Sequence, residues 1–310
     1  MPRIVISENM DAPAVAGLAK EFDVDYRPTL VDDPASLAQA LDSAQAWIVR
    51  NRTQVRGAAL AGASRLRVVG RLGVGLDNID VDACAARGIE VIPAVGANAE
   101  SVAEYVLAMA MVLLRGAAYL STAAVAAGRW PRQMLSQGRE VSGKVLGLVG
   151  FGSIGRVTAT KALALGMRVV AHDPALAADS PAWREAGVEP RGLDELLAAA
   201  DVVSLHLPLV AATRGLIGEE RLARMKPGAI LVNSARGGIV DEAALARALG
   251  SGRLAGAALD VFAEEPLRAS SVLAGVPNLI LTPHIAGVTQ ESNERVSGLV
   301  AERVAACLRR

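Results

Sequence analysis

The sequence predicts an α/β protein made of two doubly wound domains, each with a parallel sheet between layers of helices. Short runs rich in Val, Ile and Leu recur along the chain and are continuous rather than alternating, as in strands that are buried on both faces. Segments rich in Ala, Leu and Glu with helical periodicity separate these runs. The length of 310 residues also suits two domains.

The predicted strands fall into two sets. The first set, within residues 1–97, is "RIVI", "VDY", "AWIV", "LRVVG" and "IEVI". The second set, within residues 98–287, is "VLGLVG", "RVVAHD", "DVVSLHL", "AILVNSA", "GAALDVF" and "LILTPH". We expect the first set to form one domain, completed by a C-terminal helix within residues 288–310, and the second set to form the other domain.

A long apolar segment lies between the two sets. Asn98 or Ser101 can cap a helix, and Glu104 follows Ser101 by three residues, as in a capping box. We therefore predict a helix over about 101–126. Its central run, "VLAMAMVLL", is too apolar for an ordinary surface helix, so either the rest of the chain or a second subunit must cover it.

Composition limits the classes of partner. Lys and Arg number 32, and Asp and Glu also number 32, so the chain lacks the net charge that attracts nucleic acids or anionic membranes. The longest apolar stretch is about half as long as a membrane span requires. Two cysteines without paired spacing predict neither a disulfide framework nor a metal site. We expect a small-molecule ligand, no metal, and a cytoplasmic protein without an export signal.

The stretch "VLGLVGFGSIGR" predicts a dinucleotide site. Gly150, Gly152 and Gly155 follow a strand and open a helical segment, which is the order that a Rossmann fold requires. Gly150 allows a tight turn, Gly152 lets the backbone approach a pyrophosphate, and Gly155 lets the helix pack closely on the strand. The helix N-terminus then offers unpaired N–H groups to the anion.

Asp173 ends the next predicted strand, 18 residues beyond Gly155. A carboxylate at this place can accept hydrogen bonds from the adenine ribose and repels a 2′-phosphate, so NAD is expected rather than NADP. Asp173 also precedes Pro174, a common turn pairing, and both roles can hold together.

A nicotinamide site implies hydride transfer, which requires a group that exchanges the hydroxyl proton. The chain has three histidines: His172, His206 and His284. His172 lies beside the ribose residue, whereas His206 and His284 each end a predicted strand. The residues alone leave both His284 and His206 as candidates for the base.

A series of motifs resembles one enzyme family along nearly the whole chain. The motifs are "VVGRLGVGLDNID", "GANAESVAEYVLAMAM", "GFGSIGR", "SLHLPL", "MKPGAILVNSARGGIVDEAAL", "AALDVFAEEPL" and "LILTPHIAGVT". They are similar to the D-isomer-specific 2-hydroxyacid dehydrogenases, nearest the phosphoglycerate dehydrogenase branch. The resemblance implies a homodimeric, NAD-dependent enzyme with a Rossmann cofactor domain, a flavodoxin-like substrate domain and a site in the cleft between them. NADH-sensing transcriptional corepressors share this fold and remain the alternative.

The resemblance implies a catalytic trio of Arg236, Glu265 and His284. Arg236 would bind the substrate carboxylate in a bidentate fork and polarise the C2 oxygen. His284 would exchange the hydroxyl proton, and Glu265 would orient the imidazole and favour its protonated form. Glu265 is preferred over Glu264 because the acid of the family directly precedes a proline.

The resemblance also implies binding residues for the two ligands. The substrate carboxylate would meet the backbone of Gly73, Val74 and Gly75. The cofactor contacts would be Val74, Gly150, Gly152, Ser153, Ile154, Gly155, Asp173, Leu207, Ser234, Ala235, Arg236, Asp260, His284 and Gly287. Ala286 departs from the glycine that is frequent in relatives, which affects the expected loop geometry beside the nicotinamide. The chain ends at Arg310 without the regulatory domains of some relatives, so serine-type feedback is not expected.

Three arginines follow predicted strands of the first domain, where ligands of open α/β sheets bind. In the phosphoglycerate branch, positions matching Arg50 and Arg71 face the distal phosphate of the substrate. Arg52 is equally well explained as a solvated surface residue. Arg132 would add positive charge from the partner subunit. The expected substrate therefore carries a second anionic group, like 3-phosphoglycerate or sulfolactate.

Overall fold

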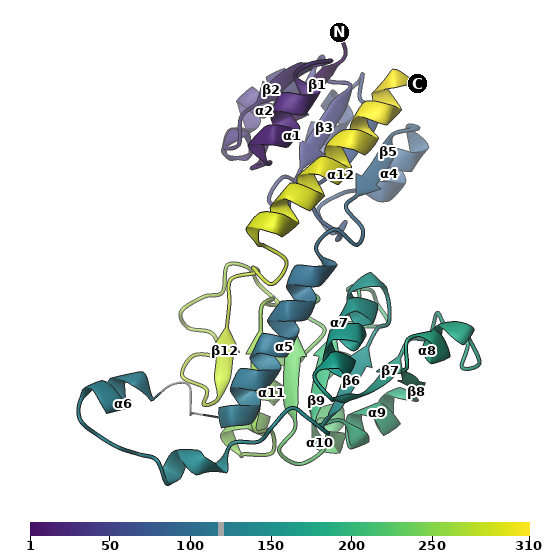
Figure 1. Ribbon diagram of the computed structural model, residues 1–310. Helices are drawn as coiled ribbons and strands as arrows, with labels where there is room; N and C mark the ends of the chain where they lie inside the picture. The colour runs from purple at the N-terminus through teal and green to yellow at the C-terminus, as the bar shows by residue number, and fades with distance from the viewer. Residues whose placement is uncertain (117–120) are drawn as a thin grey trace. The chain divides into compact units, whose positions relative to one another are not determined.

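The computed structural model describes residues 1–116 and 121–310. These residues form two compact units (Figure 1). The first unit comprises Met1–Asn98 and Val288–Arg310, and the second comprises Ala99–Gly287. Both units are α/β structures with parallel sheets, which confirms the predicted fold class.

The first unit contains a five-stranded parallel sheet in the order β2-β1-β3-β4-β5. This is the strand order of flavodoxin-like folds. The register pairs Val49 of β3 with Arg71 of β4, so both strands end at the same edge. The strands are β1 (Arg3–Ile6), β2 (Asp23–Tyr26), β3 (Ala46–Val49), β4 (Val68–Arg71) and β5 (Glu90–Pro93).

Helices cover both faces of this sheet. Packed on one face, α1 and α12 form a core with Ile4, Ile6 and Ile48, and α2, α3 and α4 close the other face over Val5 and Trp47. Alternating strand residues therefore enter different cores, which is why the strands read as continuous apolar runs. The helices are α1 (Ala12–Leu18), α2 (Pro34–Leu41), α3 (Gly57–Gly62), α4 (Val81–Ala86) and α12 (Gln290–Arg309), with a 3₁₀ turn η1 (Leu30–Asp32).

The second unit contains a seven-stranded parallel sheet in the order β12-β11-β10-β9-β6-β7-β8. Its strand order reverses between β6 and β9, as in Rossmann folds. The strands are β6 (Val145–Val149), β7 (Arg168–His172), β8 (Glu189–Pro190), β9 (Val202–Leu205), β10 (Ile230–Asn233), β11 (Gly256–Leu259) and β12 (Leu279–Leu281). Strand β8 was not predicted, because it has only two residues, contains a proline and has no apolar run.

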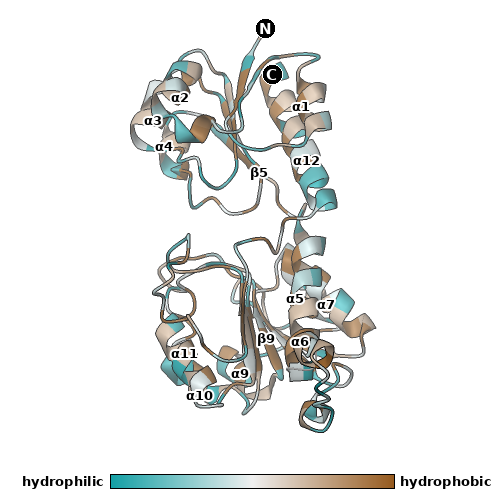
Figure 2. Ribbon diagram, turned by 90° about the vertical axis from the view of Figure 1, so that its left-hand side faces the viewer, coloured by the Kyte–Doolittle hydropathy of each residue, from teal (hydrophilic) through white to brown (hydrophobic). Residues whose placement is uncertain are grey.

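Two layers of helices enclose this sheet, and Figure 2 shows the apolar strands between them. Helices α5 and α7 pack on one face, and α9, α10 and α11 lie on the other. The helices are α5 (Ala99–Arg115), α6 (Thr122–Ala126), α7 (Ser153–Ala164), α8 (Pro181–Glu185), α9 (Leu193–Ala199), α10 (Glu219–Arg224) and α11 (Glu242–Gly250), with a 3₁₀ turn η3 (Met134–Gln137).

Helix α5 is shorter than the helix predicted over 101–126. It begins at Ala99 and ends at Arg115, where Gly116 adopts a left-handed φ of 63°, a common way to end a helix. Ser101 lies inside the first turn and is buried, so the predicted capping box is wrong. Glu104 instead accepts a hydrogen bond from Lys161 Nζ at 3.1 Å. Residues 117–120 of the predicted helix lie outside the described residues.

The apolar face of α5 is covered mainly by its own unit. Val106, Ala110 and Leu114 are buried in a core that includes Leu146 of β6. Large exposed apolar side chains instead lie beyond α5, at Val125 (45% exposed), Trp130 (77%) and Met134 (72%). The large exposed apolar side chains of this part of the chain thus lie in the 121–139 segment rather than on α5.

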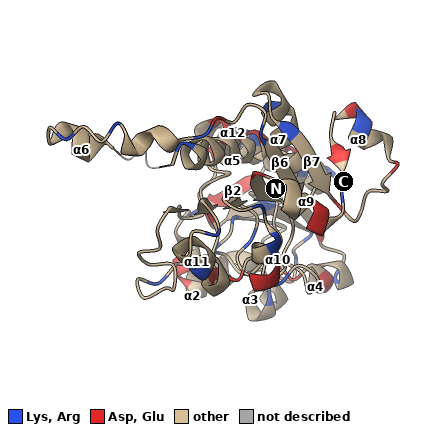
Figure 3. Cartoon of the chain, turned by 90° about the horizontal axis from the view of Figure 1, so that it is seen from below, with Lys and Arg blue, Asp and Glu red and all other residues tan. Residues whose placement is uncertain are grey.

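The surface of the described residues carries mixed charge. Figure 3, which colours the backbone by residue type, shows positions of Lys and Arg interspersed with positions of Asp and Glu along the helices. Within residues 1–116 and 121–310, no helix is both long and apolar enough to cross a membrane, and no three His, Cys, Asp or Glu side chains gather as a metal site. Both cysteines are buried as free thiols.

Candidate active site

The glycine loop after β6 has the geometry of a phosphate-binding turn. Gly150 has a φ of 103°, and a Cβ there would lie 2.3 Å from the carbonyl oxygen of His206. A Cβ on Gly155 would lie 2.5 Å from the carbonyl oxygen of Gly150, so this glycine lets α7 approach the loop. Gly152 faces open space and precedes α7 without a side-chain cap, which leaves the first N–H groups of α7 for an anion.

Asp173 follows β7 and braces this loop. Its Oδ2 accepts a hydrogen bond from the Phe151 N–H at 2.8 Å, and its Oδ1 accepts one from the Ala175 N–H at 2.9 Å. The second contact is the turn role that the Asp-Pro sequence suggested. A carboxylate accepts about four hydrogen bonds, so Asp173 keeps capacity for two ribose hydroxyls.

The other predicted cofactor residues of the second unit surround the same sheet edge. Ser234 follows β10, and its Oγ is buried without a hydrogen-bond partner. The neighbouring Ala235 is also buried. Leu207 follows β9 and packs against the core, as does Ile154 in the first turn of α7. Ser153 is exposed and Gly287 is half-buried. An orphaned hydroxyl, an open glycine and an uncapped helix end all fit a bound dinucleotide.

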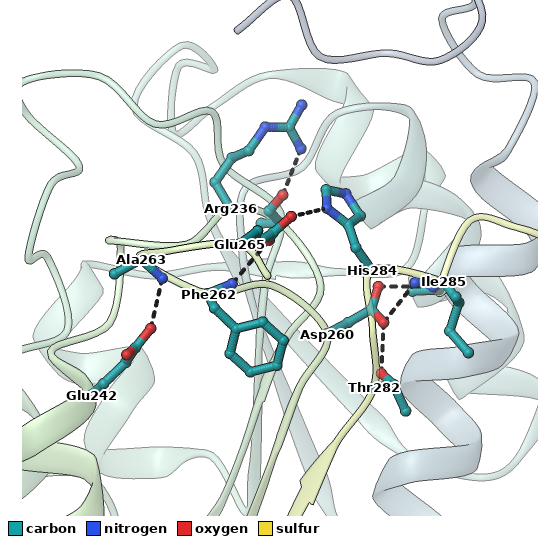
Figure 4. A network of polar contacts seen from close by, with 11 residues as sticks. Arg236, Glu242, Asp260, Phe262, Ala263, Glu265, Thr282, His284 and Ile285 are labelled. Carbon is teal, nitrogen blue, oxygen red and sulfur yellow. Dashed lines mark hydrogen bonds and ion pairs between the residues drawn. The ribbon is translucent and has the colours of Figure 1, made fainter. Parts of the chain in front are cut away.

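Glu265 and His284 form the centre of the predicted trio (Figure 4). His284 Nδ1 lies 2.8 Å from Glu265 Oε2, and the side chains are 41% and 35% exposed. The other carboxylate oxygen, Oε1, accepts a hydrogen bond from the Phe262 N–H at 3.0 Å. The imidazole is thereby oriented through Nδ1, which leaves Nε2 for a ligand.

Opposing effects act on the Glu265 carboxyl. Burial raises its pKa, whereas the hydrogen bonds from His284 and the Phe262 N–H lower it, as do the charges of His284 and Arg236. The net effect lowers the pKa of Glu265 below its ordinary value of 4.5. Glu265 is therefore ionised at neutral pH and suited to stabilise an imidazolium.

The third member of the trio sits on a loop that approaches Glu265 closely. Asn233 fixes this loop, because its side chain accepts from the Ala235 N–H at 3.1 Å and donates to the Arg236 carbonyl at 3.0 Å. A Cβ on Gly237 would lie 1.7 Å from the carbonyl oxygen of Phe262. Only glycine allows these two loops to touch, and their contact brings the Arg236 charge to Glu265.

Asp260 holds the backbone that presents His284. The side chain of Asp260 is almost completely buried and accepts hydrogen bonds from Thr282 Oγ1 (2.6 Å) and from the N–H groups of Ile285 and Ala286 (2.8 Å each). Its carbonyl accepts from the His284 N–H at 2.8 Å. His284 has a left-handed φ of 56°, a conformation that costs energy in a non-glycine residue and that these bonds sustain.

Thr282 extends this network to α5. Because its hydroxyl proton is donated to Asp260, Thr282 accepts from the Tyr105 hydroxyl at 2.7 Å. Ala286, the departure from the family pattern, is buried and donates to Asp260. The loop is therefore fixed with alanine at this position.

His206, the competing candidate for the base, is in a different environment. Burial lowers its pKa to about 4, and its Nε2 lies 3.0 Å from Ser204 Oγ. No carboxylate hydrogen-bonds its ring among the described residues. His206 is thus neutral at physiological pH and tied to the sheet, which favours His284 as the proton-exchanging group.

The predicted substrate residues of the first unit lie at one end of its sheet. Arg50 directly follows β3, and Arg71 is the last residue of β4, the neighbouring strand. The Arg71 guanidinium lies against Gly73, where a Cβ would be 2.3 Å from Nη1. Val74 and Gly75 continue this loop and are half-buried. Arg52 forms an exposed ion pair with Asp32, which fits its solvated-surface alternative.

Comparisons with known proteins place the chain in a family. Residues 107–286 match the model of "D-isomer specific 2-hydroxyacid dehydrogenase, NAD binding domain". The chain belongs to the D-isomer specific 2-hydroxyacid dehydrogenase family. Members of this family are NAD-dependent oxidoreductases, so the chain is an NAD-dependent 2-hydroxyacid dehydrogenase. The corepressor alternative is not favoured.

Individual relatives of this dehydrogenase cover nearly all of it. It is 57% identical to (S)-sulfolactate dehydrogenase of Chromohalobacter salexigens, over 98% of this chain and 97% of the relative. It is 42% identical to D-3-phosphoglycerate dehydrogenase of Mycobacterium leprae over 98% of this chain, but spans only 56% of that relative. The structure of D-lactate dehydrogenase from Aquifex aeolicus with NAD and lactic acid has a TM-score of 0.85 at 32% identity, covering 99% and 95% of the two chains.

The residues that support the site are not evident from the sequence. Asp260 was expected at the cofactor rather than at the His284 loop, and Asn233 was not predicted. The rule that ligands lie beyond the carboxyl ends of strands draws attention to Asn233, which is the last residue of β10.

Proposed function

We propose that the protein oxidises a D-configured 2-hydroxyacid with a sulfonate as second anionic group, or reduces the corresponding 2-oxoacid. The observation that carries this assignment is the His284–Glu265 pair beside the Arg236 loop, together with two arginines at adjacent strand ends of the first unit. The similarity to (S)-sulfolactate dehydrogenase supports the sulfonate over a phosphate.

The descriptor of that relative agrees with D-specific chemistry. In sulfolactate the CH₂–sulfonate group outranks the carboxylate, because sulfur outranks oxygen in the priority rules. In lactate the methyl group ranks below the carboxylate. The same spatial arrangement is therefore (R) in D-lactate and (S) in sulfolactate, so an (S)-sulfolactate enzyme needs no inversion of a D-specific site.

Residues of the second unit would hold the cofactor and move the proton. NAD, when bound by the glycine loop and Asp173, supplies the hydride acceptor. Arg236 binds the substrate carboxylate and polarises the C2 oxygen. Because Nδ1 of His284 faces Glu265, Nε2 takes the C2 hydroxyl proton in oxidation and returns it in reduction. Glu265 stabilises the imidazolium that results.

The first unit would recognise the substrate, with residues 1–97 and 288–310 as the substrate domain and residues 98–287 as the NAD domain. The backbone of Gly73, Val74 and Gly75 contacts the carboxylate in this scheme. Arg50 and Arg71 bind the distal anion by charge-assisted hydrogen bonds.

The functional form is a cytoplasmic homodimer in this proposal. The exposed side chains of Val125, Trp130 and Met134 support a second copy as their cover. Arg132 lies among them and can contribute positive charge to the site of the partner subunit.

Turnover of a panel of 2-oxoacids with NADH tests the function. We expect sulfopyruvate to be preferred over phosphohydroxypyruvate, pyruvate and a branched-chain 2-oxoacid. Arg71→Ala should cost about 1.5 to 3 kcal/mol in kcat/KM for the dianionic acids only. A preference of the wild type for apolar acids would disprove the anionic-tail assignment and leave the dehydrogenase assignment intact.

A further inference from the structure

Two buried side chains hold the turn that carries Arg50. Glu8 follows β1 and is 4% exposed. Its Oε1 accepts hydrogen bonds from the N–H groups of Arg50 (2.8 Å) and Thr53 (3.0 Å), and its Oε2 accepts from the Arg52 N–H at 3.1 Å. One carboxylate thus satisfies three backbone donors of a four-residue turn.

Asn78 holds the same turn by binding the backbone carbonyl groups of the turn. It is 6% exposed, and its Nδ2 donates to the carbonyl oxygens of Arg50 (3.1 Å) and Thr53 (2.7 Å). The Asn78 carbonyl also accepts from the Val55 N–H at 2.8 Å. Glu8 and Asn78 together, here called the turn clamp, bind the N–H and C=O groups at both ends of the turn.

Ser7, just after β1, and Trp47 of β3 reinforce the turn clamp with buried polar groups. Ser7 Oγ lies 3.1 Å from Thr53 Oγ1 and accepts a hydrogen bond from Trp47 Nε1 at 3.0 Å. Ser7, Trp47 and Thr53 are all buried. The turn is therefore anchored to the strand ends of the sheet rather than free to move with solvent.

The turn clamp fixes where the Arg50 side chain begins. Nη1 of Arg50 donates to Asn293 Oδ1 (3.0 Å) and to the Asn9 carbonyl (3.3 Å), which leaves Nε and Nη2 without a protein acceptor among the described residues. Burial lowers the pKa of Arg50, and the Glu8 charge opposes that shift. An arginine held in this way offers two donors in a fixed direction.

We propose that Glu8 and Asn78 are positioning residues for substrate selectivity, which preorganise Arg50 to bind the second anionic group. The inference rests on the proposed function. A buried carboxylate near an anion site is otherwise a disadvantage, because its charge repels the ligand. The presence of the Glu8 carboxylate is explained if the fixed geometry of the turn adds more to the binding free energy than the charge repulsion removes from it.

The test compares selectivity, defined as kcat/KM for sulfopyruvate divided by kcat/KM for pyruvate, in wild type and variants. In Glu8→Gln the amide nitrogen faces backbone N–H groups, and in Asn78→Ala both carbonyl contacts are lost. We expect either change to lower selectivity about ten- to a hundredfold, mainly through the KM for sulfopyruvate. Asp25→Asn is the control, because it breaks ion pairs with Arg3 and Arg27 in the same unit and should keep selectivity.

A double variant separates positioning from general destabilisation. In an Arg50→Ala background, Glu8→Gln should lower selectivity no further, whereas a merely structural role would act in both backgrounds. If folded Glu8→Gln and Asn78→Ala keep the wild-type selectivity, the inference is overturned and the proposed substrate is unaffected. A wild type that does not select sulfopyruvate would overturn both the inference and the proposed substrate.

Discussion

His284 shows how one residue depends on several others. Its left-handed backbone is sustained by Asp260, and its ring is oriented by Glu265. The carboxylate of Asp260 holds the loop, and in the proposed function the carboxylate of Glu265 acts on the proton. The two acids have different surroundings, because Asp260 is almost fully buried among N–H groups and Glu265 faces an imidazole.

Replacing His284 by Ala should therefore remove proton exchange without disturbing the cofactor loop. We expect kcat to fall about 100- to 10,000-fold, the usual effect of losing a general acid or base. NADH affinity, measured by fluorescence titration, should stay near the wild-type value. The matched comparison is His206→Ala, and a larger loss of kcat there than in His284→Ala would show that the base is misassigned.

His206 should instead make stability depend on pH. Its pKa is lowered from an ordinary 6.5 to about 4 in the fold, so between these values the unfolded chain binds a proton that the native protein excludes. The free energy of unfolding should thus fall as pH falls from about 6.5 to 4, by about 2 kcal/mol at pH 5.

Urea unfolding at pH 7 and pH 5 measures this effect. The substitution His206→Gln removes the titrating group. The decrease in the free energy of unfolding between pH 7 and pH 5 should therefore be smaller in the variant, by about 2 kcal/mol. The same loss in wild type and variant would assign the acid sensitivity to other groups.

Some helices, strands and loops could be predicted from the sequence, and others could not. The strands and the glycine loop were predictable because their signals are local: apolar runs, and three glycines between a strand and a helix. The end of α5 was missed because Gly116 lies within a long Ala-rich and Leu-rich run. Carboxylates such as Glu8 could not be found by periodicity, because their partners are more than 40 residues away.

At the start of α7, two glycines with different surroundings give a paired prediction. A Cβ on Gly152 meets nothing within 4 Å, whereas a Cβ on Gly155 meets the Gly150 carbonyl at 2.5 Å. Gly152→Ala should keep the melting temperature and weaken NADH binding, because the added methyl occupies the approach to the pyrophosphate. Gly155→Ala should lower the melting temperature, because α7 must move from the loop.

Thermal melts and NADH titrations of both variants distinguish the two roles. Equal loss of stability in the two variants would mean that Gly152 also serves packing. Unaltered NADH affinity in Gly152→Ala would place the pyrophosphate elsewhere.

At the scale of the whole molecule, the proposed function assigns different roles to the two units. The seven-stranded unit contains the trio and the glycine loop, and the five-stranded unit contains the arginines and the turn clamp. If the proposed function holds, substrate selectivity belongs to the five-stranded unit and the hydride chemistry to the seven-stranded unit. This division fits a family whose relatives here are named for lactate, sulfolactate and phosphoglycerate.

Subunit association is the last property to test at this scale. Trp130 and Met134 are exposed far more than large apolar side chains usually are, and they lie beyond α5 in the 121–139 segment. A charge placed there would have to be desolvated in a dimer, so Trp130→Glu should shift the mass from two chains to one in light scattering at micromolar concentration. Val272→Glu is the control, since Val272 is also exposed but lies in a different part of the second unit. A wild-type protein that is monomeric, or a Trp130→Glu protein that stays dimeric while Val272→Glu dissociates, would move the interface away from this segment.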